Sequence, residues 1–239
     1  MSNVVILGDG LLGSELTTQT KWDMISRKKD GFGITDPSTF SLLLETYDGM
    51  AQKAKYDTII NCIANTDTYS TDRQAHWDVN YKGVAELVEF CNKWKVKLVH
   101  ISTDYVYANS TAVPTEEDVP VHQETYYAYT KLLADGYIEL RSGDYLLIRA
   151  THKPTPFPYE KAWINQVGNF DYVNVIAQMI SQLIQSNASG TYNVGTQLKS
   201  MFTLAQQTNK EVLPTKKANN LVPGDTIMNL DKLNKHLSK

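Results

Sequence analysis

The sequence has few of the features that mark disulfide-rich, secreted or membrane proteins. It contains two cysteines in 239 residues, Cys62 and Cys91, which form no CxxC motif. We interpret them as reduced packing residues. No apolar run approaches the roughly 20 residues needed to cross a bilayer, and the amino terminus shows no basic region followed by a hydrophobic signal core. We therefore expect a cytoplasmic protein with no membrane partner.

Neither sign of charge dominates, since 23 lysine and arginine side chains stand against 26 acidic ones. This balance gives no electrostatic reason to expect nucleic acid as a partner. The five histidines show no ligand spacing, so we expect no structural metal. With 42% hydrophobic and 21% charged residues, the composition is typical of a globular protein. A small molecule is the expected partner.

Short apolar runs alternate with longer helical patterns, which is typical of βαβ units around a parallel sheet. The runs predicted as strands are residues 3–7, 22–26, 56–63, 97–103, 145–149 and 190–195. Helices are predicted from residue 11 onward, over 37–51, 75–95, 126–141 and 171–186, and near 202–209 and 231–237. We therefore predict an α/β fold, a Rossmann-type doubly wound parallel sheet with a small C-terminal substrate lobe.

A glycine pattern of the form GxGxxG, made by Gly8, Gly10 and Gly13, lies between the first predicted strand and the first predicted helix. Glycines in that place permit a tight turn and a close approach of the backbone to a pyrophosphate, which faces the helix amino terminus. The pattern predicts a dinucleotide site to which Leu11 and Leu12 also contribute. The alternative is an ordinary strand-to-helix turn that contains three glycines.

The residues after the second predicted strand bear on the choice of dinucleotide. A carboxylate there binds the adenosine ribose of NAD, whereas basic residues accept the 2′-phosphate of NADP. The sequence has Arg27 and Lys28 in this place, directly after Ser26. NADP(H) is therefore favoured over NAD(H), with Asp30 as the contrary residue. A solvated basic turn is the alternative interpretation.

The texture of the sequence changes after Ala150. Pro154, Pro156 and Pro158 cannot continue a helix or a central strand, so the segment that holds them is predicted as a loop. The predicted units are an NADP(H)-binding core at 1–150, joined by a helix and a strand at 171–195, and a small substrate lobe at 151–170 and 196–239, together one compact unit.

Tyr127 and Lys131 are four residues apart, so they lie on one face of their predicted helix. A tyrosine, with an ordinary pKa near 10, needs a cation beside it to exchange a proton near neutral pH, and Lys131 can supply one. Thr103 follows the preceding strand at the carboxyl edge, where ligands bind in open α/β sheets. These three side chains are the candidate catalytic residues. A core tyrosine with a solvated lysine, and an ordinary strand-end threonine, are the alternatives.

These residues resemble the extended short-chain dehydrogenase/reductase family, and more narrowly its dTDP-4-dehydrorhamnose reductase branch. The segment LVHISTDYVY at 98–107 is similar to the branch's LVHISTDYVF, and NCIANT at 61–66 to its NAAAYT. Further similar segments are 78–80, 114–118, 127–132, 190–195 and 223–233. The resemblance therefore covers nearly the whole chain.

The resemblance implies roles for individual residues. Tyr127 would donate a proton to a sugar 4-keto oxygen, Lys131 would hold the nicotinamide ribose and lower the pKa of the tyrosine, and Thr103 would hydrogen-bond the same carbonyl. Further implied cofactor contacts are Ile34, Ile63, Ala64, Asn65 and Asn80, and further implied substrate contacts are Thr66, Asp104, Tyr105 and His152. Two alternatives stay open: Asn80 bonding within its own helix, and Asp104 acting only as a turn or cap residue.

Several residues depart from the branch's pattern. His152 stands where the branch has a tryptophan near the sugar, and Gly33 replaces an acidic residue on the adenine side. The branch usually has a glycine shortly after the DYVF sequence, but the turn that begins at Ala108 contains none. The substrate lobe is also smaller than in family members. The departures concentrate on the substrate side, so the cofactor half of the resemblance is the more strongly supported.

The resemblance implies an NADPH-dependent reductase of a 4-keto-6-deoxy sugar nucleotide, with the nucleotide sugar as the small-molecule partner and a homodimer as one assembly to be expected. A nucleotide-sugar epimerase or dehydratase of the same family is the first alternative. The second is a dinucleotide-binding regulatory subunit without catalysis, similar to the reductase-like subunit of some methionine adenosyltransferases.

Overall fold

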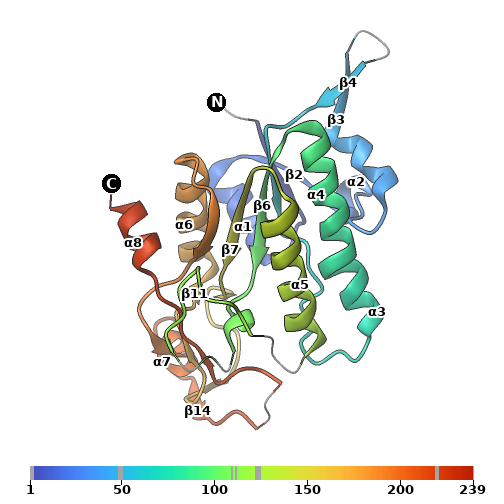
Figure 1. The fold of residues 1–239 in the computed structure, drawn as a ribbon. Helices are drawn as coiled ribbons and strands as arrows, with labels where there is room; N and C mark the ends of the chain where they lie inside the picture. The colour runs from blue at the N-terminus through green and yellow to red at the C-terminus, as the bar shows by residue number, and fades with distance from the viewer. Residues whose placement is uncertain are drawn as a thin grey trace.

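In the computed structural model, six strands form one parallel sheet in the order β12-β7-β6-β5-β1-β2 (Figure 1). The structure describes residues 3–47, 51–108, 110, 112–121, 125–218 and 221–238. Every pairing within this sheet is parallel. The strands are β1 (Val4–Leu7), β2 (Asp23–Ile25), β5 (Thr58–Asn61), β6 (Lys97–Ser102), β7 (Tyr145–Arg149) and β12 (Gly190–Asn193).

The central strands are mostly apolar and almost fully buried because both faces of the sheet are covered. All four residues of β1 and all four of β5 are buried. Val5 and Ile59 pack into the core on one face, while Ile6 and Ile60 pack into the core on the other. The alternation assigns each strand residue to one of two helical layers, as the predicted doubly wound fold requires.

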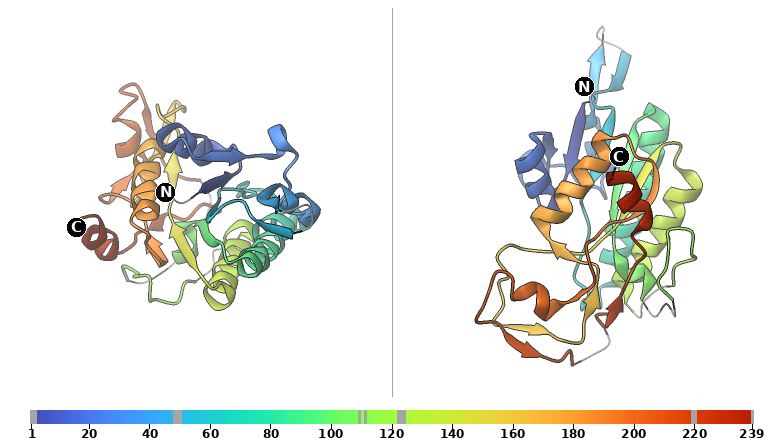
Figure 2. Two further views of the ribbon diagram at one scale, coloured as in Figure 1. Left: turned by 90° about the horizontal axis from the view of Figure 1, so that it is seen from above. Right: turned by 90° about the vertical axis from the view of Figure 1, so that its left-hand side faces the viewer.

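Helices cover the two faces of the sheet as separate layers (Figures 1 and 2). One layer consists of α5 (Tyr126–Arg141) and a continuous run of α3 (Arg73–His76), the π-helical η2 (Trp77–Lys82) and α4 (Gly83–Trp94). The other consists of α1 (Leu11–Thr20) and α6 (Val173–Gln185), with α8 (Asp231–Leu237) beside α6. The predicted α/β fold class is therefore confirmed.

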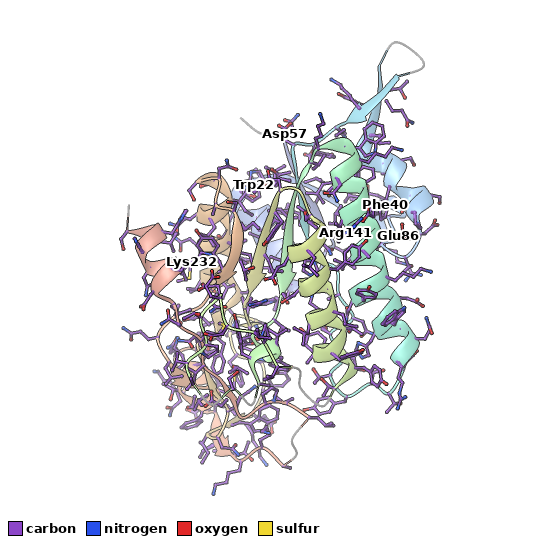
Figure 3. All side chains as sticks on the ribbon, in the orientation of Figure 1. Trp22, Phe40, Asp57, Glu86, Arg141 and Lys232 are labelled. Atoms are coloured by element: carbon purple, nitrogen blue, oxygen red, sulfur yellow. The ribbon has the colours of Figure 1, made fainter. Side chains whose placement is uncertain are left out.

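The helix predicted over 37–51 is wrong beyond Leu43. Asp36 caps a 3-10 helix, η1 (Pro37–Leu43), by accepting a hydrogen bond from the backbone of Ser38. Phe40 on η1, labelled in Figure 3, packs edge-on against Phe90 of α4, with ring centroids 5.6 Å apart. The chain then forms an antiparallel hairpin of β3 (Leu44–Tyr47) and β4 (Ala51–Ala54).

The pairing of β3 with β4, and not the helical spacing of the apolar residues, determines the conformation of these two segments. Across the hairpin Lys53 forms an ion pair with Glu45 at 2.7 Å, and cross-strand pairs of this kind stabilise an antiparallel ladder. The helical spacing of the apolar residues carries only local information, so it could not show that β3 pairs with β4.

Residues 154–160, which hold the three prolines, form the predicted loop, and short strands lie before and after it. These are β8 (His152–Lys153), β9 (Lys161–Trp163), β10 (Val167–Gly168), β11 (Asp171–Tyr172), β13 (Lys199–Ser200), β14 (Leu213–Thr215) and β15 (Asp225–Thr226), with α7 (Met201–Ala205). They pair as β8 with β11, β9 with β14, and β10 with both β13 and β15. Figure 1 shows α7 and β14 at the end of the molecule opposite the β3–β4 hairpin.

This end of the molecule has a small apolar core of its own. Its buried side chains include Phe157, Phe170, Met201 and Leu204. The core draws on both stretches that the sequence assigns to a substrate lobe, and the division into a core and a lobe stays a prediction.

The described part of the chain offers neither a membrane-spanning helix nor a metal-binding cluster. No helix in it has the length and apolar character to traverse a bilayer. Nor does it bring three or more histidine, cysteine or acidic side chains together as a metal would require. Cys62 and Cys91 both carry free thiols, in agreement with their interpretation as reduced residues.

Candidate active site

The glycine turn between β1 and α1 can accept a phosphate group. Gly8 has φ +102, and a Cβ on Gly13 would lie 2.0 Å from the carbonyl oxygen of Gly8. A Cβ on Gly8 would lie 3.0 Å from Ile63 at the end of β5. Around Gly10, by contrast, 4 Å of open space surrounds the place of a Cβ, and no side chain caps α1 there. The turn therefore fits a pyrophosphate against the amino terminus of α1.

A pocket of about 1150 Å³ extends from this turn to the small lobe. That volume exceeds the roughly 300 to 1,000 Å³ of an ordinary small-ligand site, which leaves room for a substrate beside part of a dinucleotide. On the sheet side it is lined by Gly10, Leu11, Leu12, Cys62, Ala64, Thr66, Thr103, Tyr105, Tyr127 and Lys131. On the lobe side the lining includes His152, Lys153, Phe157, Trp163, Gln166 and Val222.

Tyr127 presents a protonated phenol to this pocket. It lies in the first turn of α5, which begins after the cap residue Thr125. Burial raises the pKa of Tyr127 to about 12, and a hydrogen bond with the Thr103 hydroxyl partly opposes the rise. The Tyr105 ring packs edge-on against the Tyr127 ring, with centroids 5.8 Å apart. At neutral pH Tyr127 is therefore a proton donor held beside Thr103.

Lys131 lies one turn further along α5 and is 1% exposed. Its ammonium nitrogen donates a hydrogen bond to the Ile101 carbonyl oxygen at 2.8 Å and lies 2.9 Å from Nε2 of His100. Burial lowers the pKa of Lys131 to about 8, while Asp135 and Cys62 act in the opposite direction. Tyr127 and Lys131 both line the pocket, so the structure brings the predicted pair to one site.

Asn80 fixes the chain segment that follows β5. Its Oδ1 accepts from the Asn65 backbone N–H at 2.8 Å, and its Nδ2 donates to the Asn65 carbonyl oxygen at 3.0 Å. Nδ2 also lies 3.2 Å from the Thr130 hydroxyl on α5. Asn80 therefore joins three elements and is not merely bonded within its own helix. Its π-helical setting in η2 is one often found at functional sites.

The other predicted cofactor residues occupy different environments. Ala64 lines the pocket, and Ile34 is buried in the core next to Gly83. Arg27 and Lys28 are exposed on the short helix α2 (Arg27–Asp30). The structure thus places Ala64 on the pocket wall, Ile34 in the hydrophobic core, and the two basic residues at the surface.

Asp104 lies behind the pocket wall. Its carboxylate accepts hydrogen bonds from the Thr151 hydroxyl at 2.5 Å and the Thr103 hydroxyl at 3.3 Å, and the residue is 0% exposed. Burial raises its pKa, against the effect of the hydrogen bond from Thr151. The structure does not bring Asp104 to the pocket surface, whereas Thr66, Tyr105 and His152 do line it. Asp104 holds Thr103 in place.

Strand β8 brings two nitrogen-bearing side chains to the lobe side of the pocket. Burial lowers the pKa of His152 to about 4, so its imidazole is neutral at neutral pH. Burial also lowers the pKa of Lys153, and the Asp104 charge partly opposes this. Sequence reasoning missed Lys153, because the only signal was its place directly after His152. It equally missed Trp163 and Gln166, which reach the pocket only through pairing within the lobe.

The fold and the site together define a class of protein. An open parallel sheet, a glycine turn at its edge and a Tyr–Lys pair on one helix define a Rossmann-type fold with a candidate dinucleotide site. Residues 1–152 match the family model described as the RmlD substrate binding domain, and the chain belongs to this family.

Named relatives agree with this assignment. The dTDP-4-dehydrorhamnose reductase of Mycobacterium tuberculosis is 30% identical over 145 residues, which cover 55% of this chain and 44% of that enzyme. The chain thus spans less than half the length of this curated relative.

Solved structures share the fold over most of their length. The dTDP-4-dehydrorhamnose reductase of Bacillus anthracis in complex with NADP superposes with a TM-score of 0.79 at 23% identity, covering 98% of this chain and 92% of that one. A dTDP-glucose 4,6-dehydratase of Streptomyces venezuelae with NAD bound gives a TM-score of 0.76 at 13% identity, covering 97% and 89%.

Proposed function

We propose that the protein is an NADPH-dependent reductase of a 4-keto-6-deoxy sugar nucleotide. The observation that carries the proposal is the partly buried phenol of Tyr127, hydrogen-bonded to Thr103 and placed with Lys131 on the wall of one pocket that also reaches the glycine turn. The named reductase relatives support the same substrate class. The bound cofactor would supply a hydride to the carbonyl carbon.

The residues of the chain provide the remaining chemistry. Tyr127 donates its phenolic proton to the carbonyl oxygen, so hydride and proton together convert the ketone to a secondary alcohol. Thr103 orients that oxygen through its hydroxyl. Lys131, in its charged form, stabilises the phenolate that remains. General acid catalysis of this type contributes about 10²- to 10⁴-fold to the rate.

Two observations favour NADP(H) over NAD(H). Arg27 and Lys28 are exposed after β2, where a 2′-phosphate would be expected. The contrary residue Asp30 is occupied locally, because its Oδ2 accepts a hydrogen bond from the Ser26 backbone at 2.9 Å. A carboxylate committed to its own turn is less available to a ribose. The relative from Bacillus anthracis was crystallised with NADP.

Lys153 is suited to an anionic oxygen of the substrate. It lines the pocket, and no hydrogen bond or ion pair within the described ranges engages its ammonium group. The Asp104 charge acts on Lys153 without a direct hydrogen bond, so an anionic ligand that pairs with the ammonium group would further offset its desolvation. A phosphate of the nucleotide sugar is the group we assign to it.

The epimerase or dehydratase alternative retains one supporting observation, the shared fold of the dTDP-glucose 4,6-dehydratase. Such an enzyme would regenerate its nicotinamide within each turnover and would show no net NADPH consumption. The regulatory alternative is opposed by the convergence of Thr103, Tyr127 and Lys131 on one pocket.

The test uses purified protein with NADPH and a panel of dTDP- and UDP-linked 4-keto-6-deoxy sugars, followed at the nicotinamide absorbance band. The proposal predicts stoichiometric NADPH oxidation with at least one sugar. Protein that is folded and binds NADPH, yet oxidises none with any sugar of the panel, would contradict it. Product formation without net oxidation would favour the epimerase or dehydratase.

A further inference from the structure

His100 on β6 connects the candidate catalytic lysine to the end of β5. Its Nε2 lies 2.9 Å from Nζ of Lys131, and its Nδ1 lies 3.1 Å from Nδ2 of Asn61. His100 and Asn61 are 0% exposed and Lys131 is 1% exposed. Because these three groups are buried, their hydrogen-bond partners strongly influence their charge states.

The orientation of the Asn61 amide fixes one end of this chain of groups. Asn61 Oδ1 accepts a hydrogen bond from the Ile63 backbone N–H at 3.0 Å. The amide nitrogen Nδ2 therefore faces His100, and an amide nitrogen is only a donor. Nδ1 of His100 must accept that hydrogen bond, so it carries no proton.

The other end follows from the proton count of a neutral imidazole. Burial holds the pKa of His100 well below its ordinary value, so the ring has a single proton. That proton lies on Nε2 and points at Nζ of Lys131. A charged ammonium group has no lone pair to accept it, whereas an uncharged amine does and can still donate to Ile101.

We propose that His100 is a positioning residue which, in the tautomer set by Asn61, stabilises the uncharged form of Lys131. Charging Lys131 then requires Nε2 to become the acceptor, the ring proton to move to Nδ1, and the Asn61 amide to turn. Turning the amide breaks its bond to the Ile63 backbone. The role of this tautomer switch in catalysis rests on the proposed function, whereas the tautomer of His100 does not.

The tautomer of His100 links the charge of Lys131 to the candidate dinucleotide site. Ile63 packs against Gly8 in the glycine turn, since a Cβ on Gly8 would lie 3.0 Å from its side chain. A ligand that shifts the segment after β5 therefore also shifts the balance between the two tautomers. The charge of Lys131 thus responds to the glycine turn through Ile63, Asn61 and His100.

Other titratable groups around Lys131 act on the same equilibrium. Asp135 on α5 and Cys62 after β5 both favour the charged lysine, and the Asp135 carboxylate is itself paired with Arg149 at 3.0 Å. Tyr127 stays protonated at neutral pH because its pKa is about 12. None of these groups supplies a second acceptor for the His100 proton.

The test is the tautomer of His100, read from the ¹⁵N chemical shifts of its ring in histidine-labelled full-length protein at pH 9, above the pKa of about 8 that burial gives Lys131. We expect a protonated Nε2 and an unprotonated Nδ1. Assignment uses the signals lost in His100→Gln. His236 on α8, which bonds Ser186 and Tyr192, gives an internal reference that should not change.

A second variant reverses the arrangement. In Asn61→Asp the two carboxylate oxygens can accept from both the Ile63 N–H and the His100 ring, which requires a proton on Nδ1. We expect the ring signals to exchange character and the Lys131 titration, followed at its Cε resonance, to move to higher pH by about one pH unit or more.

A wild-type ring protonated on Nδ1, or doubly protonated, at pH 9 would overturn the proposal even if Asn61→Asp fails to fold. Because neither readout uses turnover, a protein that reduces no sugar but shows the expected tautomer would refute the proposed function alone.

Discussion

The side chain of Asn80 forms hydrogen bonds with both peptide groups of Asn65, accepting from its N–H at 2.8 Å and donating to its carbonyl at 3.0 Å. Asn80 is 0% exposed, and Asn65 itself is half-buried. The segment after β5 that lines the pocket is therefore shaped by a residue from a separate helix. Its removal tests whether that shape matters for the cofactor.

Asn80→Ala is expected to lower the free energy of unfolding by about 1 to 3 kcal/mol, because buried peptide groups lose their partners. It should also weaken NADPH binding, measured by fluorescence titration. Gln74→Ala, an exposed change on α3 of the same helical run, serves as control and should alter stability by no more than about 0.5 kcal/mol. Unaltered NADPH affinity in folded Asn80→Ala would reject the link to the cofactor site.

Gly13→Ala is expected to abolish NADPH binding, since the new Cβ would lie 2.0 Å from the Gly8 carbonyl oxygen and the turn must open. The matched control is Gly136→Ala in α5, where 4 Å around the new Cβ is clear. There alanine should stabilise the protein by about 0.5 to 1 kcal/mol. Thermal unfolding and NADPH titration distinguish the two. Normal NADPH binding by Gly13→Ala would show that the glycine turn is not part of the NADPH site.

Lys153→Met is expected to raise the KM for the nucleotide sugar roughly 10- to 100-fold, the effect of losing one hydrogen bond to a charged group. NADPH affinity should be unchanged. Lys235→Met on α8 removes the same charge from an exposed helix and provides the control. An equal effect of both variants would show that general charge, and not contact with the substrate, explains the result.

Lys131 should give stability a defined pH dependence. Burial lowers its pKa from 10.5 to about 8, so between these values the unfolded chain binds more protons than the folded one. The free energy of unfolding contributed by this group therefore rises with pH through that window and is constant below it. Lys131→Met should lose this contribution.

The measurement compares urea denaturation of wild type and Lys131→Met at pH 7.5 and pH 9 as a difference of differences, so that other titrating groups cancel. Wild type should gain stability relative to the variant by up to about 2 kcal/mol over this range. Parallel pH dependences would mean that the lysine titrates normally.

Much of the fold could be predicted from the sequence because the buried strands carry continuous apolar runs. The predicted bounds of α5 (Tyr126–Arg141), β7 (Tyr145–Arg149) and α8 (Asp231–Leu237) agree with the structure. Tyr127 and Lys131 could be placed together because their spacing alone puts them on one helix face. Local periodicity was sufficient for each of these.

The remaining features depend on contacts between distant segments. β8 and β11 are two residues long each and carry no pattern of their own, so the position of Lys153 on the pocket wall could not be read from sequence. Asn61 and His100 lie within strands whose apolar neighbours indicate only burial. Their hydrogen bond across adjacent strands requires the register of β5 and β6.

The most direct test of the account is the rate of NADPH oxidation by Tyr127→Phe with a sugar nucleotide that wild type reduces. Phenylalanine preserves the ring and its contact with Tyr105 but removes the proton donor. We expect NADPH affinity to be retained and kcat to fall by about 10²- to 10⁴-fold. A Tyr127→Phe protein that oxidises NADPH at the wild-type rate would contradict the central claim that this phenol is the general acid.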